Sequence, residues 1–179
     1  MKLHARWTTH LAGIVLLVAG TSAQAATHRH VQSALLHAGF DIDSTWHQKD
    51  CGAVADGVPC VAYQTSDNKS DLFYISSKAL PLDDAMTADV LFAKDGKGGW
   101  TKSGRMDKQA AERIEGKGWK GWRATADCGI EDENGVHDTG ECMTVFVSNG
   151  QRTIIVETSG TVSNDDVLGI VVSTLSIGK

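Results

Sequence analysis

The sequence of 179 residues lacks the local motifs by which many enzymes are recognised. It contains no GxSxG nucleophile elbow, no HExxH metal-binding pair and no nucleophile beside a basic partner. His37, His47 and His137 remain as candidates for acid–base chemistry. Paired carboxylates of the glycosidase type stay open as an alternative, because they need no local signature. We therefore predict a protein that is not an enzyme and uses no cofactor.

Long apolar runs are also missing, except near the N-terminus. Lys2 and Arg6 give a positive start, residues 11–20 are apolar, and Ala-Gln-Ala at 23–25 is the small-x-small pattern that a signal peptidase accepts. A membrane-spanning helix needs about 20 apolar residues, so this run is too short for a stable membrane anchor. The pattern predicts a signal peptide of residues 1–25, cleaved after Ala25, and a periplasmic protein.

The sequence has no concentrated basic stripe. It has 17 basic and 22 acidic residues, and removal of Lys2 and Arg6 leaves 15 against 22, a net charge of −7 for residues 26–179. Such an acidic chain is a poor candidate for binding nucleic acid or an anionic membrane, and it suits a basic protein partner. The 154 residues from 26 to 179 are an ordinary length for one domain.

None of the four cysteines are close enough in sequence to form a CxxC metal or redox site. An even number of cysteines in an exported protein is typical of disulfides. Four cysteines allow three pairings. We favour Cys51–Cys60 and Cys128–Cys142, because each pair brackets a Gly/Asp-rich loop that a bridge would close. In the loop-entropy model, each bridge of this size contributes about 3 kcal/mol to stability.

The chain before residue 119 contains three predicted helices and one hairpin. The i, i+3, i+4, i+7 spacing of apolar residues predicts a helix at 31–38. Strand-like runs on both sides of a polar turn at 67–70 predict a hairpin. Further helices are predicted at 82–93, with Asp83 as the N-cap, and at 108–115.

The last 60 residues predict a three-stranded meander followed by a helix. Asn149-Gly150 is the preferred dipeptide of a two-residue hairpin turn, which would pair Ser148 with Gln151. One face of this hairpin is then mixed and partly exposed. The other face is apolar apart from one arginine, and it comprises Met143, Val145, Val147, Arg152, Ile154 and Val156. A third strand at 119–128 is joined to it by a loop at 129–141, and Ser163 starts the terminal helix.

These elements predict an α+β fold, in which an antiparallel sheet (the hairpin plus the three-stranded meander) is covered by helices and the C-terminal helix packs on the sheet. Over residues 119–177 the order of elements resembles small exported sandwich folds of the PsbP kind. In those folds a meander is followed by a C-terminal helix.

Residues 130–141 partly match an EF-hand calcium loop, with oxygen-bearing side chains and a glycine at the required spacing. Ile130 replaces the first carboxylate, and no helices are predicted on either side. The simpler interpretation is a solvated acidic loop closed by Cys128–Cys142. We predict no metal in this segment.

Two other partial motifs also have simpler interpretations. Gly96, Lys102 and Ser103 nearly spell a phosphate-binding P-loop, but Thr101 stands where a glycine is required, and a flexible Gly/Lys loop with an exposed Trp100 explains them. Cleavage after Ala25 would leave Ala-Thr-His at 26–28, a tripeptide able to hold copper or nickel that also arises by chance.

The signal peptide, size, four cysteines and acidic charge together resemble the profile of periplasmic immunity proteins against type VI secretion cell-wall amidases. The resemblance implies a binding protein that plugs the active-site cleft of a secreted hydrolase, a peptidoglycan amidase, and that can form a homodimer. The densest acidic segment is the expected contact, with partner-binding residues Glu131, Asp132, Glu133, Asn134, His137 and Asp138. The alternatives are a small periplasmic hydrolase or ligand-binding domain whose site is not visible in sequence, and an envelope assembly factor.

Overall fold

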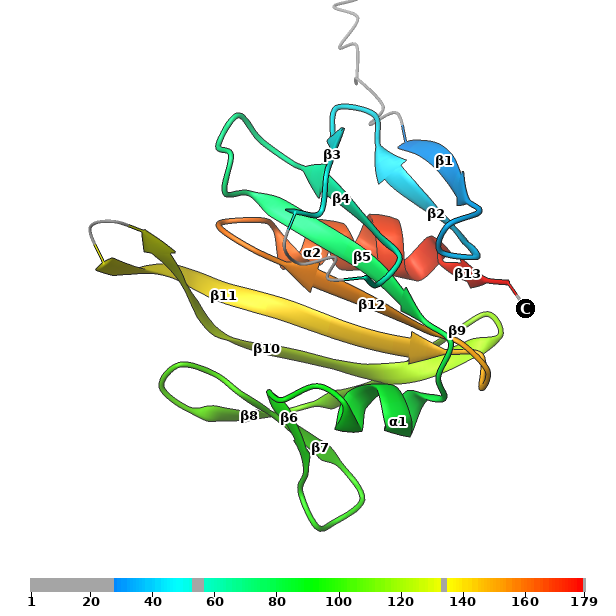
Figure 1. Ribbon diagram of the computed structural model, residues 1–179, viewed down its shortest axis with the longest axis vertical. Helices are drawn as coiled ribbons and strands as arrows, with labels where there is room; N and C mark the ends of the chain where they lie inside the picture. The colour runs from blue at the N-terminus through cyan, green and yellow to red at the C-terminus, as the bar shows by residue number, and fades with distance from the viewer. Residues whose placement is uncertain (1–27, 53–56, 133–134, 179) are drawn as a thin grey trace, which may run out of the picture.

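A seven-stranded antiparallel sheet forms the centre of the structure, a computed structural model that describes residues 28–52, 57–132 and 135–178 (Figure 1). Its strands, in spatial order, are β3 (His47–Lys49), β4 (Cys60–Gln64), β5 (Leu72–Lys78), β12 (Thr153–Thr158), β11 (Gly135–Ser148), β10 (Trp119–Asp132) and β9 (Glu112–Gly116). We call it the main sheet. Each neighbouring pair is antiparallel, and β10 and β11 are the longest strands, with 14 residues each.

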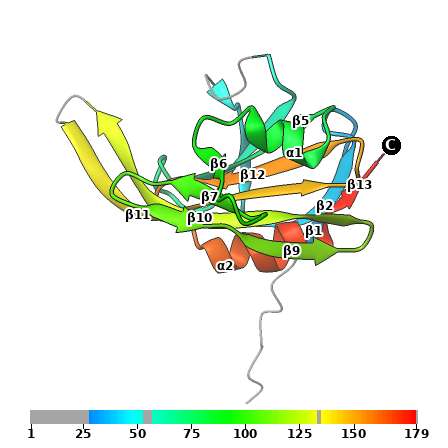
Figure 2. The same ribbon diagram turned by 90° about the horizontal axis from the view of Figure 1, so that it is seen from below.

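Different elements cover the two faces of the main sheet, with α1 and α2 on opposite sides (Figure 2). One face carries the larger hydrophobic core, beneath a helix and a three-stranded sheet. These are α2 (Asn164–Asp166), which continues as the π-helical turn η2 (Val167–Val172), and β1 (His28–Ser33), β2 (Ala38–Asp43) and β13 (Ser176–Ile177). The other face carries the smaller core, beneath α1 (Leu82–Thr87), β6 (Phe92–Lys94), β7 (Trp100–Ser103) and β8 (Lys108–Ala110).

The predicted α+β fold, a sheet covered by helices, is wrong. The described residues are mostly strand, and small antiparallel sheets supply much of the covering layers. The segment predicted as a helix at 31–38 is a β-hairpin, in which Ala38, Phe40 and Ile42 are buried at period two. Its turn is closed by the Leu36 backbone N–H, which donates to Ser33 Oγ at 3.2 Å.

The other two helices predicted before residue 119 are also wrong in part or in full. The segment 108–115 has no buried apolar stripe, and it pairs as a strand with β7 and then with β10. The segment 82–93 is helical only to Thr87. Beyond it Val90 is 97% exposed, and Phe92 starts β6 and packs edge-on against Phe146 with the ring centroids 5.0 Å apart. The second half of the predicted helix is therefore replaced by strand β6, which packs on the smaller core.

Several local predictions are confirmed. The hairpin around the turn at 67–70 is β4–β5. The C-terminal helix begins after Ser163, whose hydroxyl accepts from the Asp166 backbone N–H at 3.2 Å. Its apolar residues Val167, Val171 and Val172 are buried in the larger core.

The predicted register of the β11–β12 hairpin is wrong by two residues, because its turn has four residues rather than two. Ser148 faces Thr153, and Val145 faces Val156. Asn149 organises the longer turn: its Oδ1 accepts from the backbone N–H groups of Gln151 and Arg152, each at 3.0 Å. A shift of two preserves the faces, so the predicted apolar face is the buried one.

The opposite face of this hairpin, predicted to be partly exposed, is also buried. Phe146 is fully buried and Ile155 is 4% exposed, because α1 and β6 to β8 cover them. Both faces of the central strands of the main sheet are therefore covered.

Both predicted disulfides are present, with the predicted pairing Cys51–Cys60 and Cys128–Cys142. Two disulfides fit an exported protein. The signal peptide predicted at 1–25 lies outside the described residues. None of the helices in the described residues is long and apolar enough to cross a membrane.

Candidate functional site: a braced hairpin arm and an acidic groove

The predicted loop at 129–141 is instead the continuation of β10 and β11. β10 runs to Asp132 and β11 starts at Gly135, with a bulge between Cys128 and Gly129. Their sheet neighbours stop earlier, since β9 pairs only as far as Arg123 of β10, and β12 only as far as Thr144 of β11. The outer part projects from the body of the protein (Figure 1). We call residues 127–132 and 135–141 the arm.

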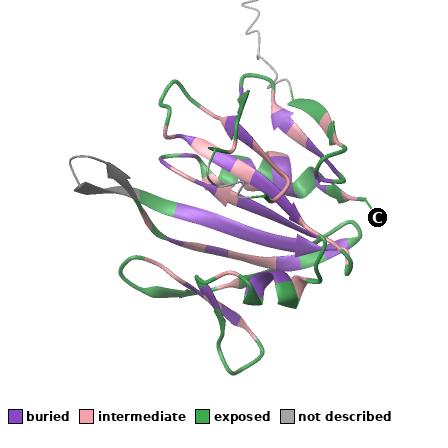
Figure 3. Ribbon diagram, in the orientation of Figure 1, coloured by how far each residue is buried: buried purple, intermediate pink, exposed green. Residues whose placement is uncertain are grey.

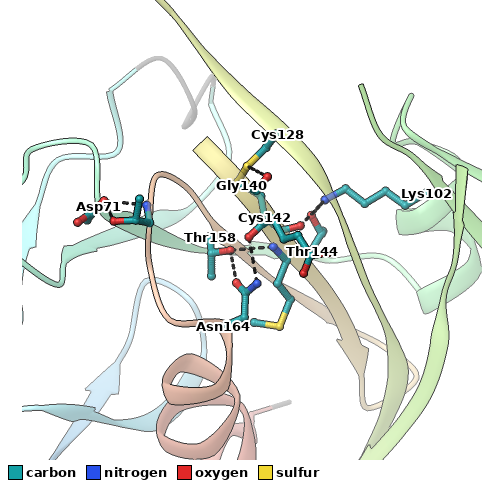
Figure 4. The surroundings of a disulfide bond; sticks show 11 residues. Asp71, Lys102, Cys128, Gly140, Cys142, Thr144, Thr158 and Asn164 are labelled. Carbon is teal, nitrogen blue, oxygen red and sulfur yellow. Dashed lines mark hydrogen bonds between the residues drawn. A yellow bond between two sulfur atoms is a disulfide. The ribbon is translucent and has the colours of Figure 1, made fainter. Parts of the chain in front are cut away.

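Three sets of contacts hold the base of the arm: a disulfide, a hydrogen-bond network around Thr158 and Asn164, and the Lys102 side chain on the opposite face. The Cys128–Cys142 disulfide joins its two strands. On the face of α2, Thr158 Oγ1 accepts from the Met143 backbone N–H at 2.8 Å and donates to Asn164 Oδ1 at 2.7 Å (Figure 4). The Asn164 side chain also donates to the Glu141 carbonyl oxygen at 3.0 Å. The base is therefore fixed in direction before any partner arrives.

Lys102 braces the opposite face of the same base. Its side chain is buried, and its Nζ donates to Thr144 Oγ1 at 2.7 Å and to the Cys142 carbonyl oxygen at 3.4 Å (Figure 4). These bonds tie β7 to β11 beside the disulfide. The Lys102 side chain of the partial P-loop motif thus makes an internal contact from strand β7, and the predicted exposure of Trp100 is wrong, because that indole is buried.

Burial places Lys102 and Glu157 in an unfavourable environment for charge. Burial lowers the pKa of Lys102, which the carboxylates of Glu157 and Asp89 partly offset. Burial also raises the pKa of Glu157 above its ordinary value of 4.5, Asp89 raises it further, and Lys102 and Lys78 act in the opposite direction. The two groups are electrostatically linked across the smaller core.

This linkage predicts an ordered series of pKa values for Glu157. Lys102→Met should raise the pKa of Glu157 further, because it removes a cation, and Asp89→Asn should lower it. Between pH 4.5 and the raised pKa, Glu157 is protonated in the folded protein and ionised in the unfolded chain. The contribution of Glu157 to the free energy of unfolding therefore falls as the pH rises through this range. NMR titration of the Glu157 carboxyl carbon in the three proteins measures the series. Equal values in all three would contradict it.

Two acidic residues face each other across the arm's base. Asp127 of β10 is directly opposite Glu141 of β11, and both are exposed. Along β11 the strand changes from buried to exposed toward the arm (Figure 3). Like charges in directly opposite positions of an antiparallel pair destabilise it. A cationic group bound between them would remove the repulsion.

Asp127 and Glu141 line a groove of about 520 Å³ that we call the acidic groove. Its charged lining residues are Glu112, Arg123, Asp127, Glu141 and Asp165, four acids against one base, a net charge of −3. Arg123 forms an ion pair with Glu112, with an Nη2–Oε2 distance of 2.7 Å. Among the described residues, no basic side chain forms an ion pair with the other three acids. The groove is therefore arranged to accept a cationic group.

The sequence-predicted partner residues lie farther out on the arm. Glu131, Asp132, His137 and Asp138 are in the paired strands, and the structure describes their backbone pairing alone. Glu133 and Asn134 lie outside the described residues. Residues 130–132 and 135–141 of the calcium-loop-like segment are strand rather than a loop between helices.

The other candidates do not gather into one site. His37 is in the turn between β1 and β2 and adopts a left-handed conformation with φ 53°, while His47 starts β3 at an exposed position. His28 begins β1, and the remainder of the Ala-Thr-His tripeptide lies outside the described residues. Within the described residues, no three His, Cys, Asp or Glu side chains lie close enough together to hold a metal.

The acidic pair was not predicted from sequence, because it depends on the β10–β11 register. Asp127 faces Glu141 because Ala126 faces Cys142 and Cys128 faces Gly140, so the disulfide is diagonal, and the cysteine pairing alone does not fix this register. The contribution of Asp165 depends on where α2 packs, and no local pattern gives that.

Comparisons with known proteins concern the fold alone. No protein-family model matches the chain, and no curated protein matches it. The chain is similar to a crystal structure from Bacteroides thetaiotaomicron VPI-5482, with a TM-score of 0.53 and 14% identity over 84% of this chain and 48% of that chain. It is also similar to cyanobacterial PsbP from Synechocystis sp. PCC 6803, with a TM-score of 0.49 and 13% identity over 90% and 98% of the two chains. The chain spans about half the length of the Bacteroides protein, and this likeness shows a shared fold.

Proposed function

We propose that the protein is a periplasmic binding protein that inhibits a secreted cell-wall hydrolase, a peptidoglycan amidase, by inserting the arm into the enzyme's active-site cleft. The observation that carries the proposal is the arm: two paired strands that project beyond their sheet neighbours and are clamped at the base by Cys128–Cys142. The proposed role as an immunity protein rests on this shape together with the exported, acidic character of the chain.

The dimensions of the arm suit a cleft. Residues 127–132 extend about 17 Å at a rise of roughly 3.3 Å per residue, and two paired strands are only about 4.8 Å apart. A narrow, long insert of this kind fits a cleft built for a polymer chain. Because the base is already held by the disulfide, Lys102 and Asn164, less conformational entropy is lost on binding.

The acidic groove supplies the second half of the contact. Asp127, Glu141 and Asp165 would receive lysine or arginine side chains from the rim of a basic enzyme while the arm enters the cleft. Complementary charge of this kind accelerates association and disfavours wrong partners. It also offsets the repulsion between Asp127 and Glu141 only in the complex.

A shortened arm tests the proposal. Deleting Ile130–Glu131 together with Val136–His137 removes two facing pairs of residues, so the alternation of the strands and the disulfide are preserved. Pull-down from a periplasmic extract containing secreted amidases should recover a basic cell-wall hydrolase with the wild-type protein and lose it with the short-arm variant. The melting temperature of both proteins is the fold control. Recovery of the same hydrolase in equal amount by both would reject the arm as the contact.

A further inference from the structure

A second cleft lies against β9 and β10, with lining residues that differ from those of the acidic groove, and the proposed inhibitor function does not use it. It has a volume of about 730 Å³ and lies between the start of α1, the β6–β7 turn and strands β9 and β10. A volume of this size is within the range of small-molecule sites. The residues that matter here are Trp100, Trp122, Lys94, Arg113 and Lys120, and we call it the tryptophan cleft.

Each indole of this cleft carries a cation over its ring. The Arg113 guanidinium carbon lies 5.1 Å from the centroid of Trp122, and Lys94 Nζ lies 5.4 Å from that of Trp100. Trp100, which the sequence suggested was exposed, is 4% exposed and forms the inner wall, whereas Trp122 is half-buried and presents indole surface to the cleft. Flat aromatic surface and positive charge are thus combined at one place.

The charge of this cleft is opposite to that of the whole chain. Lys94, Arg113 and Lys120 stand against Asp83 and Glu115, a net charge of +1 in a chain of net charge −5. Lys94 is paired with Asp83 at 3.1 Å. Among the described residues, neither Arg113 nor Lys120 has an acidic partner within ion-pair distance. Glu115 faces Lys120 directly across the β9–β10 pair without forming an ion pair, so a ligand carboxylate would compete with Glu115 for Lys120, whereas Arg113 faces Trp122.

Gly121 lies between Lys120 and Trp122 on β10. A Cβ atom at this position would clash with the Phe146 carbonyl oxygen of β11, so the close approach of the two strands beside the cleft requires glycine.

From these features we propose that the tryptophan cleft binds an anionic carbohydrate, with a sugar ring against the part of the Trp122 indole that lines the cleft beside Arg113, and a carboxylate on Arg113 and Lys120. The apolar face of a sugar ring suits an aromatic surface, and the carboxylate suits the two unpaired cations. A purely apolar ligand would desolvate these cations without compensation. The cleft shares no lining residue with the acidic groove, so sugar and protein partner can be bound together.

The probe that tests this inference is the disaccharide N-acetylglucosaminyl-N-acetylmuramic acid, which carries one carboxylate. Neutral diacetylchitobiose, of similar size and without the carboxylate, is the matched control ligand. Titrations followed by tryptophan fluorescence and calorimetry should show saturable binding of the acidic disaccharide and at least tenfold weaker binding of the neutral one. Absence of saturable binding of the acidic disaccharide at millimolar concentration would overturn the proposal.

Variants separate ligand contact from folding. Trp122→Ala should weaken binding at least tenfold, and Arg113→Gln should abolish the preference for the acidic over the neutral sugar while leaving the melting temperature unchanged. Lys69→Ala, in the β4–β5 turn, is the control and should bind like the wild type. An intact acid preference in Arg113→Gln would refute the assigned carboxylate contact. The short-arm variant should bind the sugar normally, so failure of the inhibitor proposal is distinguishable from failure of this one.

Discussion

We expect the Val145→Asp variant to be largely unfolded. Val145 is fully buried in the larger core, on the central strand β11, with Val156 of β12 on one side and Arg123 of β10 on the other. An unpaired carboxylate at this position costs several kcal/mol. The total stability of a domain is only about 5–15 kcal/mol. Loss of a cooperative thermal transition, measured by circular dichroism, is the expected result.

Val90→Asp is the matched control, because it introduces the same charge at a valine that is 97% exposed. Its melting curve should coincide with that of the wild type. A Val145→Asp protein that melts like the wild type would show that the β11 face toward α2 and η2 is not the core.

The second large effect is expected on binding. Replacing Asp127, Glu141 and Asp165 with Asn, Gln and Asn should weaken affinity for a basic hydrolase about a hundredfold, which corresponds to about 2.7 kcal/mol. The melting temperature should stay constant or rise slightly, because the repulsion between Asp127 and Glu141 is relieved. Isothermal titration calorimetry and thermal unfolding of the same samples measure both quantities.

A triple variant with the same change of net charge serves as the control. Asp50→Asn, Asp67→Asn and Asp107→Asn neutralise three exposed acids that do not line the acidic groove. Its affinity should match that of the wild type. Equal losses in the two triple variants would show that overall charge, rather than the groove, governs binding.

Features set by nearby residues could be predicted from the sequence. The β4–β5 hairpin follows from its polar turn, the start of α2 follows from the Ser163 cap, and the disulfides follow from the loops that they bracket. In each case the stabilising partner lies within a few residues, or within about 14 residues for the cysteines. Local chemistry was therefore sufficient.

Other local features were predicted wrongly, because the same residues fit more than one structure. The segments at 31–38 and 108–115 form hairpins with nearby strands: β1 pairs with β2, β8 with β7 and β9 with β10, while the distant partner β13 meets only the start of β2. The short apolar spacing at 31–38 fits a helix as well as a hairpin until the pairing is known. The register of β11 and β12 depended on one side chain, Asn149, which closes a four-residue turn.

The candidate site divides in the same way. The acidic composition of residues 131–138 marked the segment that forms the arm, but its strand structure and the opposition of Asp127 and Glu141 required the long β10–β11 register. The tryptophan cleft combines β9 and β10 with α1 and the β6–β7 turn, so its indoles and cations come together only in the fold.

If the arm blocks a cell-wall hydrolase, the protein should inhibit the hydrolysis of peptidoglycan. A purified secreted amidase is incubated with isolated cell walls and increasing amounts of wild-type or short-arm protein, and the release of soluble fragments is measured. We expect complete inhibition at a one-to-one ratio by the wild type and loss of inhibition by the short-arm variant, with equal melting temperatures. Undiminished hydrolysis in the presence of the wild-type protein, or equal inhibition by the two proteins, would contradict the proposal.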